Sequence, residues 1–206
     1  IGELERVRAW CAEHRGVALT FAGGVPPTSM FATRLDALSR SLLAQLNARH
    51  AHSIIGKICE VLSEVGVRVI SAASFMDEAL PLSGVLTQRA PDAREEQDIA
   101  LGHRVAMQIA ALEIGQSVVI KAGAVVAVEA LEGTNTTIQR AGKLGGPGCV
   151  LVKVAKDGHD MRFDIPCIGP QTLEICARSG IAVLAVEPGR SLLLDKAELE
   201  EAARRL

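Results

Sequence analysis

Two strings at the ends of residues 128–172 organise this chain: VEALEGTNTTIQRAG at 128–142 and KDGHDMRFDIPCIGPQT at 156–172. Each string places carboxylates next to glycine where the hydrophobic pattern predicts a strand-to-helix junction. Each string also contains a basic side chain that could bind a phosphate group, Arg140 in the first and Arg162 in the second. The residues before 128 are therefore interpreted as one wall of a cleft, and those after 172 as the support of the second string.

The composition indicates a globular protein and excludes a nucleic-acid partner. The 206 residues are 49% apolar and 22% charged, which is enough to bury a core. With a net charge of -2, 2% aromatic residues and no Tyr, neither phosphate-backbone binding nor base stacking is expected. Five cysteines without a CxxC motif indicate structural thiols in a reducing cytosol.

The sequence shows neither a membrane-spanning segment nor a signal peptide. No apolar run approaches the roughly 20 residues that a spanning helix needs, and no basic segment precedes an apolar one at the start. The chain begins at Ile1 and ends at Leu206 within a helical pattern, so we expect it to be a piece of a longer protein.

Helical and strand patterns alternate in the first part of the chain. They predict helices over residues 3–14, 35–46 and 53–66, and strands over 17–22 and 67–71. This alternation predicts a parallel, doubly wound sheet in a truncated Rossmann-like domain over residues 1–88. His50 and His52 precede the third helix and are interpreted as solvated side chains, because a third metal ligand is missing nearby.

The second part predicts another α/β domain, over residues 89–206, with a mixed sheet. Its expected elements are a helix over 94–112, a hairpin of 117–121 with 125–130, strands over 149–154 and 181–186, and helices from 170 and 196. The glycine-rich residues 142–148 lack the ending of a P-loop, so we expect a flexible connection or a lid there.

The first string suggests a cation site beside an anion site. Glu129 and Glu132 lie three residues apart at a strand end, where they could ligate a hard cation such as Mg²⁺. Thr134 is expected to cap a helix that starts at Asn135, whose free N–H groups would bind a phosphate oxygen. The alternative is a solvated acidic turn with an ordinary helix cap.

The second string also suggests a site that binds a cation and a phosphate. If residues 161–165 are extended, Asp160, Arg162 and Asp164 point to one face, because side chains alternate along a strand. An arginine between two carboxylates suits a site for phosphate and metal. The helix start at Gly169 would add a second group of free N–H donors. The alternative is a surface ion ladder of little energetic value.

At these residues the chain resembles the family of UDP-2,3-diacylglucosamine pyrophosphatases of the alphaproteobacterial type. The resemblance is carried by residues 98–135, 148–172 and 180–199, with the patterns EGT and D-x-R-x-D-x-P-x-I-G. It implies Mg²⁺-dependent hydrolysis of UDP-2,3-diacylglucosamine to UMP and 2,3-diacylglucosamine 1-phosphate (lipid X), in lipid A synthesis. A cytoplasmic location is expected, with peripheral contact to the inner membrane and a homodimer as further expectations.

The resemblance also implies roles for residues at matching positions. Asp164 is the first choice for metal binding or water activation, with Asp160 and Glu132 as further metal ligands. Arg162 and Lys153 are expected to clamp phosphate, and Asp164, Asp160 and Arg162 form the expected catalytic set. Expected substrate contacts cluster at the two helix starts: Gly133, Thr134, Asn135, Lys153, Gly169 and Thr172.

One position departs from the family pattern. Asn135 stands where the resemblance implies aspartate, so the carbonyl ligand remains while the charge and basicity are lost. This departure leaves an alternative open, in which the chain is a non-catalytic protein of the same fold that binds nucleotide sugars or lipid phosphates.

Overall fold

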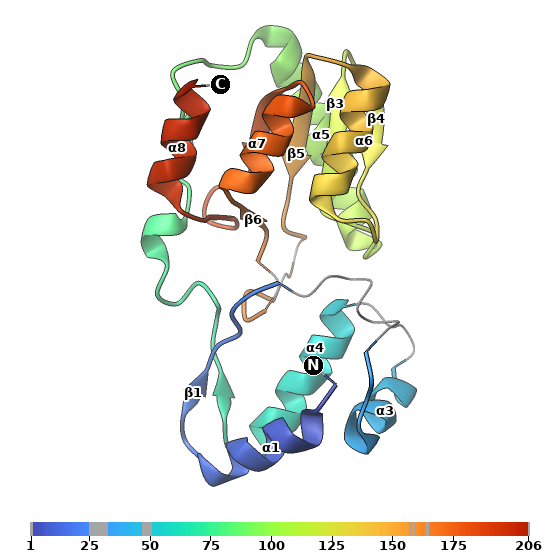
Figure 1. The fold of residues 1–206 in the computed structure, drawn as a ribbon, viewed down its shortest axis with the longest axis vertical. Coiled ribbons are helices and arrows are strands. Elements are labelled where there is room, and N and C mark those ends of the chain that lie inside the picture. Colours follow the sequence, from blue (N-terminus) through green and yellow to red (C-terminus); the bar gives the residue numbers. More distant parts are fainter. Residues whose placement is uncertain are drawn as a thin grey trace. The chain divides into compact units, whose positions relative to one another are not determined.

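The structure is a computed structural model that describes residues 2–24, 33–46, 51–156, 158, 160–163 and 165–205 (Figure 1). The chain forms two compact units. The first contains Ile1–Phe75 together with Asp160–Asp164, and the second contains Met76–His159 together with Ile165–Leu206. The short segment that begins at Asp160 therefore belongs to the first unit, although it follows most of the second unit in sequence.

The first unit alternates helix and strand as predicted. Its elements are α1 (Leu4–Glu13), β1 (Ala18–Leu19), α3 (Ala37–Ala44), α4 (Ala51–Glu64) and β2 (Arg68–Val69). The two strands pair in parallel, with Leu19 opposite Val69, and each is shorter than the sequence predicted. The core comprises Cys11, Cys59, Leu62, Val67 and Val69. The Rossmann-like character of this unit stays a prediction.

The second unit is an α/β unit with a mixed sheet, as predicted. Its helices are η1 (Asp77–Ala79), α5 (Ala93–Ala111), α6 (Thr134–Gly145), α7 (Pro170–Arg178) and α8 (Lys196–Arg205). Its strands are β3 (Ser117–Lys121), β4 (Ala124–Val128), β5 (Cys149–Lys153), β6 (Cys167–Ile168), β7 (Ile181–Val186) and β8 (Leu192–Leu193). The main sheet has the order β4-β3-β5-β7, and β6 pairs separately with β8.

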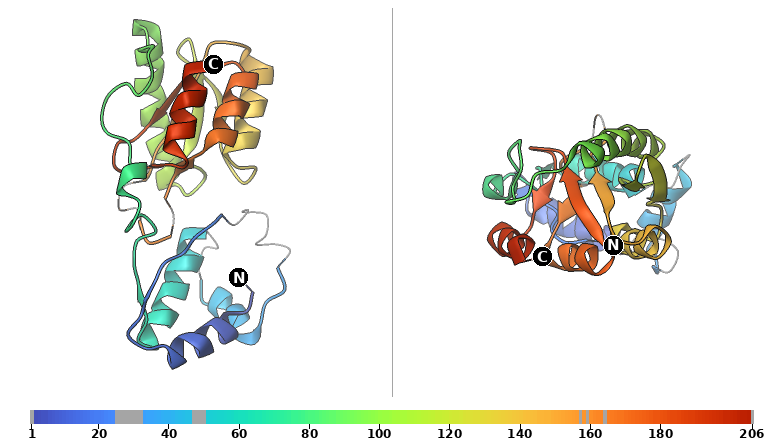
Figure 2. Two further views of the ribbon diagram at one scale, coloured as in Figure 1. Left: turned by 60° about the vertical axis from the view of Figure 1, so that its left-hand side comes forward. Right: turned by 90° about the horizontal axis from the view of Figure 1, so that it is seen from above.

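Helices cover both faces of the main sheet. Because side chains alternate along a strand, Val118 and Ile120 pack with α5, whereas Val119 packs on the opposite face with Ile138 of α6. Figure 2 shows α5 on one side of the strands, and α6 and α7 on the other. Strand β3 runs antiparallel to β4 and β5, while β5 and β7 run parallel. The carboxyl ends of β4, β5 and β7 therefore lie at one edge of the sheet.

Helix α5 is the longest described helix, with 19 residues, and it is capped at its start. The Asp92 carboxylate accepts from Glu95 N at 2.8 Å, while Glu95 Oε2 accepts from Asp92 N at 2.8 Å. This reciprocal capping box satisfies donors that the first helical turn leaves free. Within the described residues, the chain contains no helix whose length and apolarity would let it cross a membrane.

The expectation of a flexible connection or lid at residues 142–148 was wrong for 142–145, which belong to a helix, whereas 146–148 connect this helix to β5. Helix α6 continues to Gly145 and ends at Gly146, whose N–H bonds back to Gly142 O. Lys121 Nζ, on β3, then donates to Gly145 O at 2.5 Å and to Pro147 O at 2.7 Å. A cation therefore holds the carbonyls at the end of the helix, where the helix dipole is negative.

One segment of the second unit holds the chain where it leaves β5 and where it enters β6. The Glu187 carboxylate accepts from Ala155 N at 2.7 Å, and Arg190 donates to Lys156 O at 2.5 Å. Leu192 N donates to Pro166 O at 2.8 Å. Ala155, Lys156 and Pro166 are thereby all anchored to the segment 187–192, which leads from β7 into β8.

Candidate functional site

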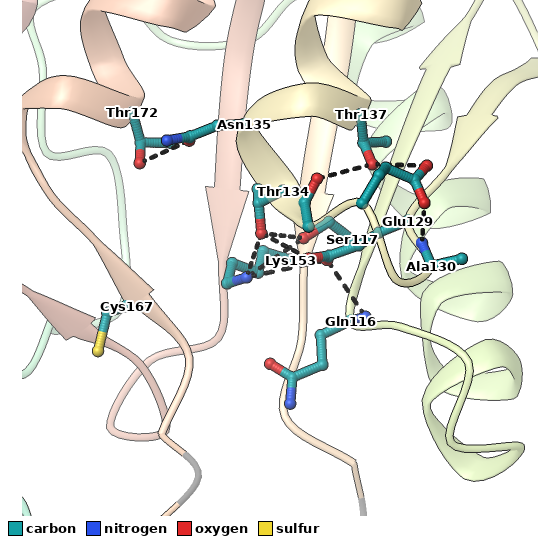
Figure 3. Close-up of polar contacts among 12 residues, drawn as sticks. Gln116, Ser117, Glu129, Ala130, Thr134, Asn135, Thr137, Lys153, Cys167 and Thr172 are labelled. Carbon is teal, nitrogen blue, oxygen red and sulfur yellow. Dashed lines mark hydrogen bonds and ion pairs between the residues drawn. The ribbon is translucent and has the colours of Figure 1, made fainter. Parts of the chain in front are cut away.

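A buried polar cluster lies at the sheet edge where β4 and β5 end (Figure 3). Lys153 is the last residue of β5, and Ser117, the first residue of β3, is its partner across the antiparallel pair. Glu129 follows β4 directly, and Thr134 begins α6. Four elements thus bring one cation, one carboxylate and two hydroxyl groups together.

The four side chains contact each other closely. Lys153 Nζ lies 2.8 Å from Thr134 Oγ1 and 3.3 Å from Ser117 Oγ. The Thr134 hydroxyl donates to Glu129 Oε1 at 2.8 Å. Glu129 Oε2 is 4.0 Å from Lys153 Nζ, so the ion pair lacks a short hydrogen bond.

Burial makes this arrangement energetically costly. The exposed fractions are 0% for Ser117, 6% for Lys153 and 8% for Glu129, whereas Thr134 is half-buried. Moving two charges out of water costs several kcal/mol for each ion, and close pairing repays only part of that cost. Lys153 also lies beside the first turn of a helix, where the helix dipole is positive.

The start of α6 differs from the sequence prediction. Thr134 is not the cap: the helix begins at Thr134, Gly133 occupies the cap position, and no side chain bonds there. The Thr134 hydroxyl is directed to Glu129 instead. Gly133 has a φ of 80°, a conformation that favours glycine. The first backbone N–H groups of α6 consequently receive no side-chain cap.

Gly115 permits the close approach that places Glu129. A Cβ atom at residue 115 would lie 2.2 Å from Glu129 O, so any larger residue would displace this backbone. Gln116 N also donates to Glu129 Oε2 at 3.4 Å. Ser117 and Gly115 were not predicted as site residues, because the pairing of β3 with β5 and β4 is not visible in the local sequence.

The start of α7 is joined to the start of α6. Gly169 occupies the cap position of α7 and makes no side-chain cap bond, and Pro170 is the first helical residue. The Thr172 hydroxyl donates to Asn135 Oδ1 at 3.1 Å. Figure 3 shows these two side chains facing one another. The expected substrate contacts at both helix starts therefore lie on neighbouring helices of the same unit.

Glu132 has different partners from Glu129. Its Oε1 lies 2.7 Å from Arg140 Nη2, and the Thr137 hydroxyl donates to the same oxygen at 3.3 Å. The Glu132 backbone N–H, Arg140 and Thr137 lower the pKa of the Glu132 carboxyl by hydrogen bonding. The two glutamates therefore have separate partners: Glu129 accepts from Thr134, whereas Glu132 pairs with Arg140.

Asp160 and Arg162 form a tight ion pair in the first unit. Arg162 Nη2 lies 2.6 Å from Asp160 Oδ2, and Arg162 Nε lies 2.9 Å from Asp160 Oδ1. Bonding to Arg162 lowers the pKa of the Asp160 carboxyl. The prediction that residues 161–165 are extended was wrong for 161–163, which form a turn. The cause is local, since Asp160 Oδ1 also accepts from Arg162 N at 3.1 Å.

The first unit anchors this turn. Ser71, just after β2, donates its hydroxyl to Met161 O at 2.8 Å. His52, in the first turn of α4, stacks at a tilt against Phe163, with ring centroids 5.3 Å apart. His52 is half-buried, so its interpretation as a solvated side chain was wrong. His50 and Asp164 lie outside the described residues.

The described residues do not by themselves fit a Mg²⁺ site. Mg²⁺ prefers octahedral oxygen ligands at about 2.0–2.1 Å. Asp160 is engaged by Arg162, and Glu132 by Arg140. Within the part of the chain that the structure describes, no three His, Cys, Asp or Glu residues come together as a possible metal site.

Fold and site together define the class of protein: an α/β protein whose mixed sheet gathers a buried lysine and two helix starts at one edge. Two family descriptions match the chain, the LpxI N-terminal domain over residues 1–79 and the LpxI C-terminal domain over 82–206. The UDP-2,3-diacylglucosamine pyrophosphatase LpxI of Caulobacter vibrioides is 31% identical over 215 residues, which cover 98% of this chain and 76% of that protein. The chain belongs to the LpxI family.

Proposed function

We propose that this protein hydrolyses the diphosphate of UDP-2,3-diacylglucosamine, and that UMP and 2,3-diacylglucosamine 1-phosphate are the products, as in lipid A synthesis. Membership of the LpxI family supports this proposal, together with the similarity to a relative named for that pyrophosphatase activity. The observation that carries it within the structure is the buried Lys153 behind the first turn of α6, since a diphosphate is the anion that such a site suits.

The residues at the sheet edge would bind and orient the diphosphate. The N–H groups in the first turns of α6 and α7 would donate to phosphate oxygens, and the helix dipoles would favour the negative charge. Asn135 belongs to the first turn of α6, and its bond to Thr172 joins that turn to the first turn of α7. Charge that develops on the phosphoryl oxygens during hydrolysis would be stabilised by the same donors.

In the proposed reaction, water attacks the sugar-side phosphorus. A bond forms between the water oxygen and this phosphorus, and the bond from the phosphorus to the bridging oxygen breaks. UMP leaves with the bridging oxygen, and the water proton passes to a base, for which Asp164 remains our candidate. Hydrolysis in ¹⁸O-labelled water should therefore place the label in the sugar phosphate and leave UMP unlabelled.

Mg²⁺ dependence is part of the proposal and rests on the family resemblance alone. The test compares UMP release before and after chelation, with Mg²⁺ restored in a third sample. Asp164→Ala provides the companion test, because an unchanged rate in this variant with Mg²⁺ present would remove Asp164 from the reaction.

A further inference from the structure

The polar cluster at the sheet edge contains one charged residue that the proposed function leaves without a role. Glu129 is 8% exposed, and its Oε1 already accepts the Thr134 hydroxyl proton at 2.8 Å. A carboxylate so buried and so engaged is poorly placed to ligate a cation from solvent. Its carboxylate instead contacts three residues of the protein itself: Thr134, Gln116 and Lys153.

The stability of the fold does not explain why a lysine occupies position 153. A cation beside the first turn of a helix faces the positive end of the helix dipole, which is unfavourable. Burial adds to this cost, since Lys153 is 6% exposed. Glu129 compensates only in part, because the two charges stay 4.0 Å apart while the shorter contact of Glu129 goes to Thr134. Positive potential therefore remains at the start of α6.

We propose that Glu129 is a positioning residue of the diphosphate site, and this inference rests on the proposed function. Glu129 fixes the Thr134 hydroxyl, Thr134 fixes the Lys153 ammonium, and Ser117 supports the ammonium from the neighbouring strand. The lysine charge is thereby held behind the N–H groups of the first turn of α6. Lys153 attracts the diphosphate by its field, while the backbone makes the contacts.

The alternative is that the Glu129–Lys153 pair only stabilises the fold. Single and double variants of these two residues distinguish the two possibilities. Lys153→Met removes the charge, Glu129→Gln keeps the shape but leaves the lysine without a counter-ion, and the double variant removes both charges. Glu174→Gln on α7 serves as the matched control, since that carboxylate is 61% exposed and pairs with Arg178. Each full-length variant is measured for Tm, for kcat and KM with UDP-2,3-diacylglucosamine, and for binding of UDP.

Lys153→Met should weaken UDP binding by about 10- to 100-fold, because the field of a partly desolvated unit charge close to the diphosphate is lost. Glu129→Gln should lower Tm and reduce kcat by about tenfold or more without raising KM, since the positive charge remains but its position is lost. The double variant should recover Tm relative to Glu129→Gln, because no buried charge is left unpaired. Its UDP binding and kcat should not recover, and Glu174→Gln should behave as the unsubstituted protein does.

The inference is overturned if the double variant recovers kcat together with Tm, or if Glu129→Gln keeps the kcat of the unsubstituted protein. Failure of the proposed function looks different, because the unsubstituted protein would then release no UMP. In that case the UDP titrations still decide the inference: equal UDP affinity in the unsubstituted protein and in Lys153→Met would exclude a role for the buried charge.

Discussion

The Thr172 hydroxyl lies 3.1 Å from Asn135 Oδ1, and this hydrogen bond joins the first turn of α7 to the first turn of α6. Two helix starts are thereby fixed next to one another at the edge where β4 and β5 end. The Thr172 hydroxyl can donate in this way to an amide oxygen or to a carboxylate oxygen at position 135. This relationship makes the departure from the family pattern directly testable.

Asn135→Asp should leave the structure intact, because an aspartate oxygen can accept the Thr172 proton equally well. A negative charge in the first turn of α6 should add about 0.3–1 kcal/mol to the free energy of unfolding. We expect no large gain in turnover, since the asparagine enzyme is active in our account. Urea unfolding and UMP release are the measurements, and a large gain in turnover would favour the non-catalytic binding protein instead.

The Asp160–Arg162 pair should make stability depend on pH in the acid range. Arg162 lowers the pKa of Asp160 below its ordinary value of 3.8, so the ionised carboxylate stabilises the folded state. That contribution is fully present above the ordinary value, and it is lost as the pH falls through the lowered one. Because Arg162 is 40% exposed, Asp160→Asn should cost only about 1 kcal/mol at neutral pH.

Urea unfolding of both proteins at neutral pH, and at successively lower pH below 3.8, measures this effect. The difference between the two proteins should shrink as the pH falls. A difference that stays constant over the same range would show that Asp160 acts through its shape and not through its charge.

Lys121→Met should destabilise the end of α6. The ammonium holds Gly145 O and Pro147 O, and its loss leaves both carbonyls without this donor. We expect a loss of about 2 kcal/mol in the free energy of unfolding, together with faster amide exchange in the last turn of α6. Lys143→Met is the matched control, because Lys143 is exposed on the same turn. Equal exchange in the two variants would contradict the capping role of Lys121.

Gly115→Ala should impair both stability and activity. The new methyl group would meet Glu129 O at 2.2 Å, and backbone cannot move aside cheaply. We expect a loss of about 1–3 kcal/mol in the free energy of unfolding, with a lower kcat because Glu129 is displaced. Gly56→Ala in α4 provides the contrast, since open space surrounds that position and alanine favours a helix. Unchanged kcat in Gly115→Ala would contradict the link between this contact and the site.

The sequence predicted the elements with strong local signals. The strand Ile181–Val186 and the helices that begin at Pro170 and Lys196 lie where the hydrophobic pattern and the glycine and proline residues placed them. The turn at Asp160 was missed because alternating charges resemble a strand, whereas the bond from Arg162 N closes a turn. The pairing of Ser117 with Lys153 joins residues far apart in sequence, so no local pattern could reveal it.

The most direct test of the proposed activity is to incubate the full chain with UDP-2,3-diacylglucosamine and Mg²⁺ and to measure UMP together with the sugar phosphate. We predict equal amounts of the two products from the unsubstituted protein, and a much lower kcat/KM in Lys153→Met with its fold verified by Tm. Absence of UMP release by the folded, unsubstituted protein would contradict the proposed function.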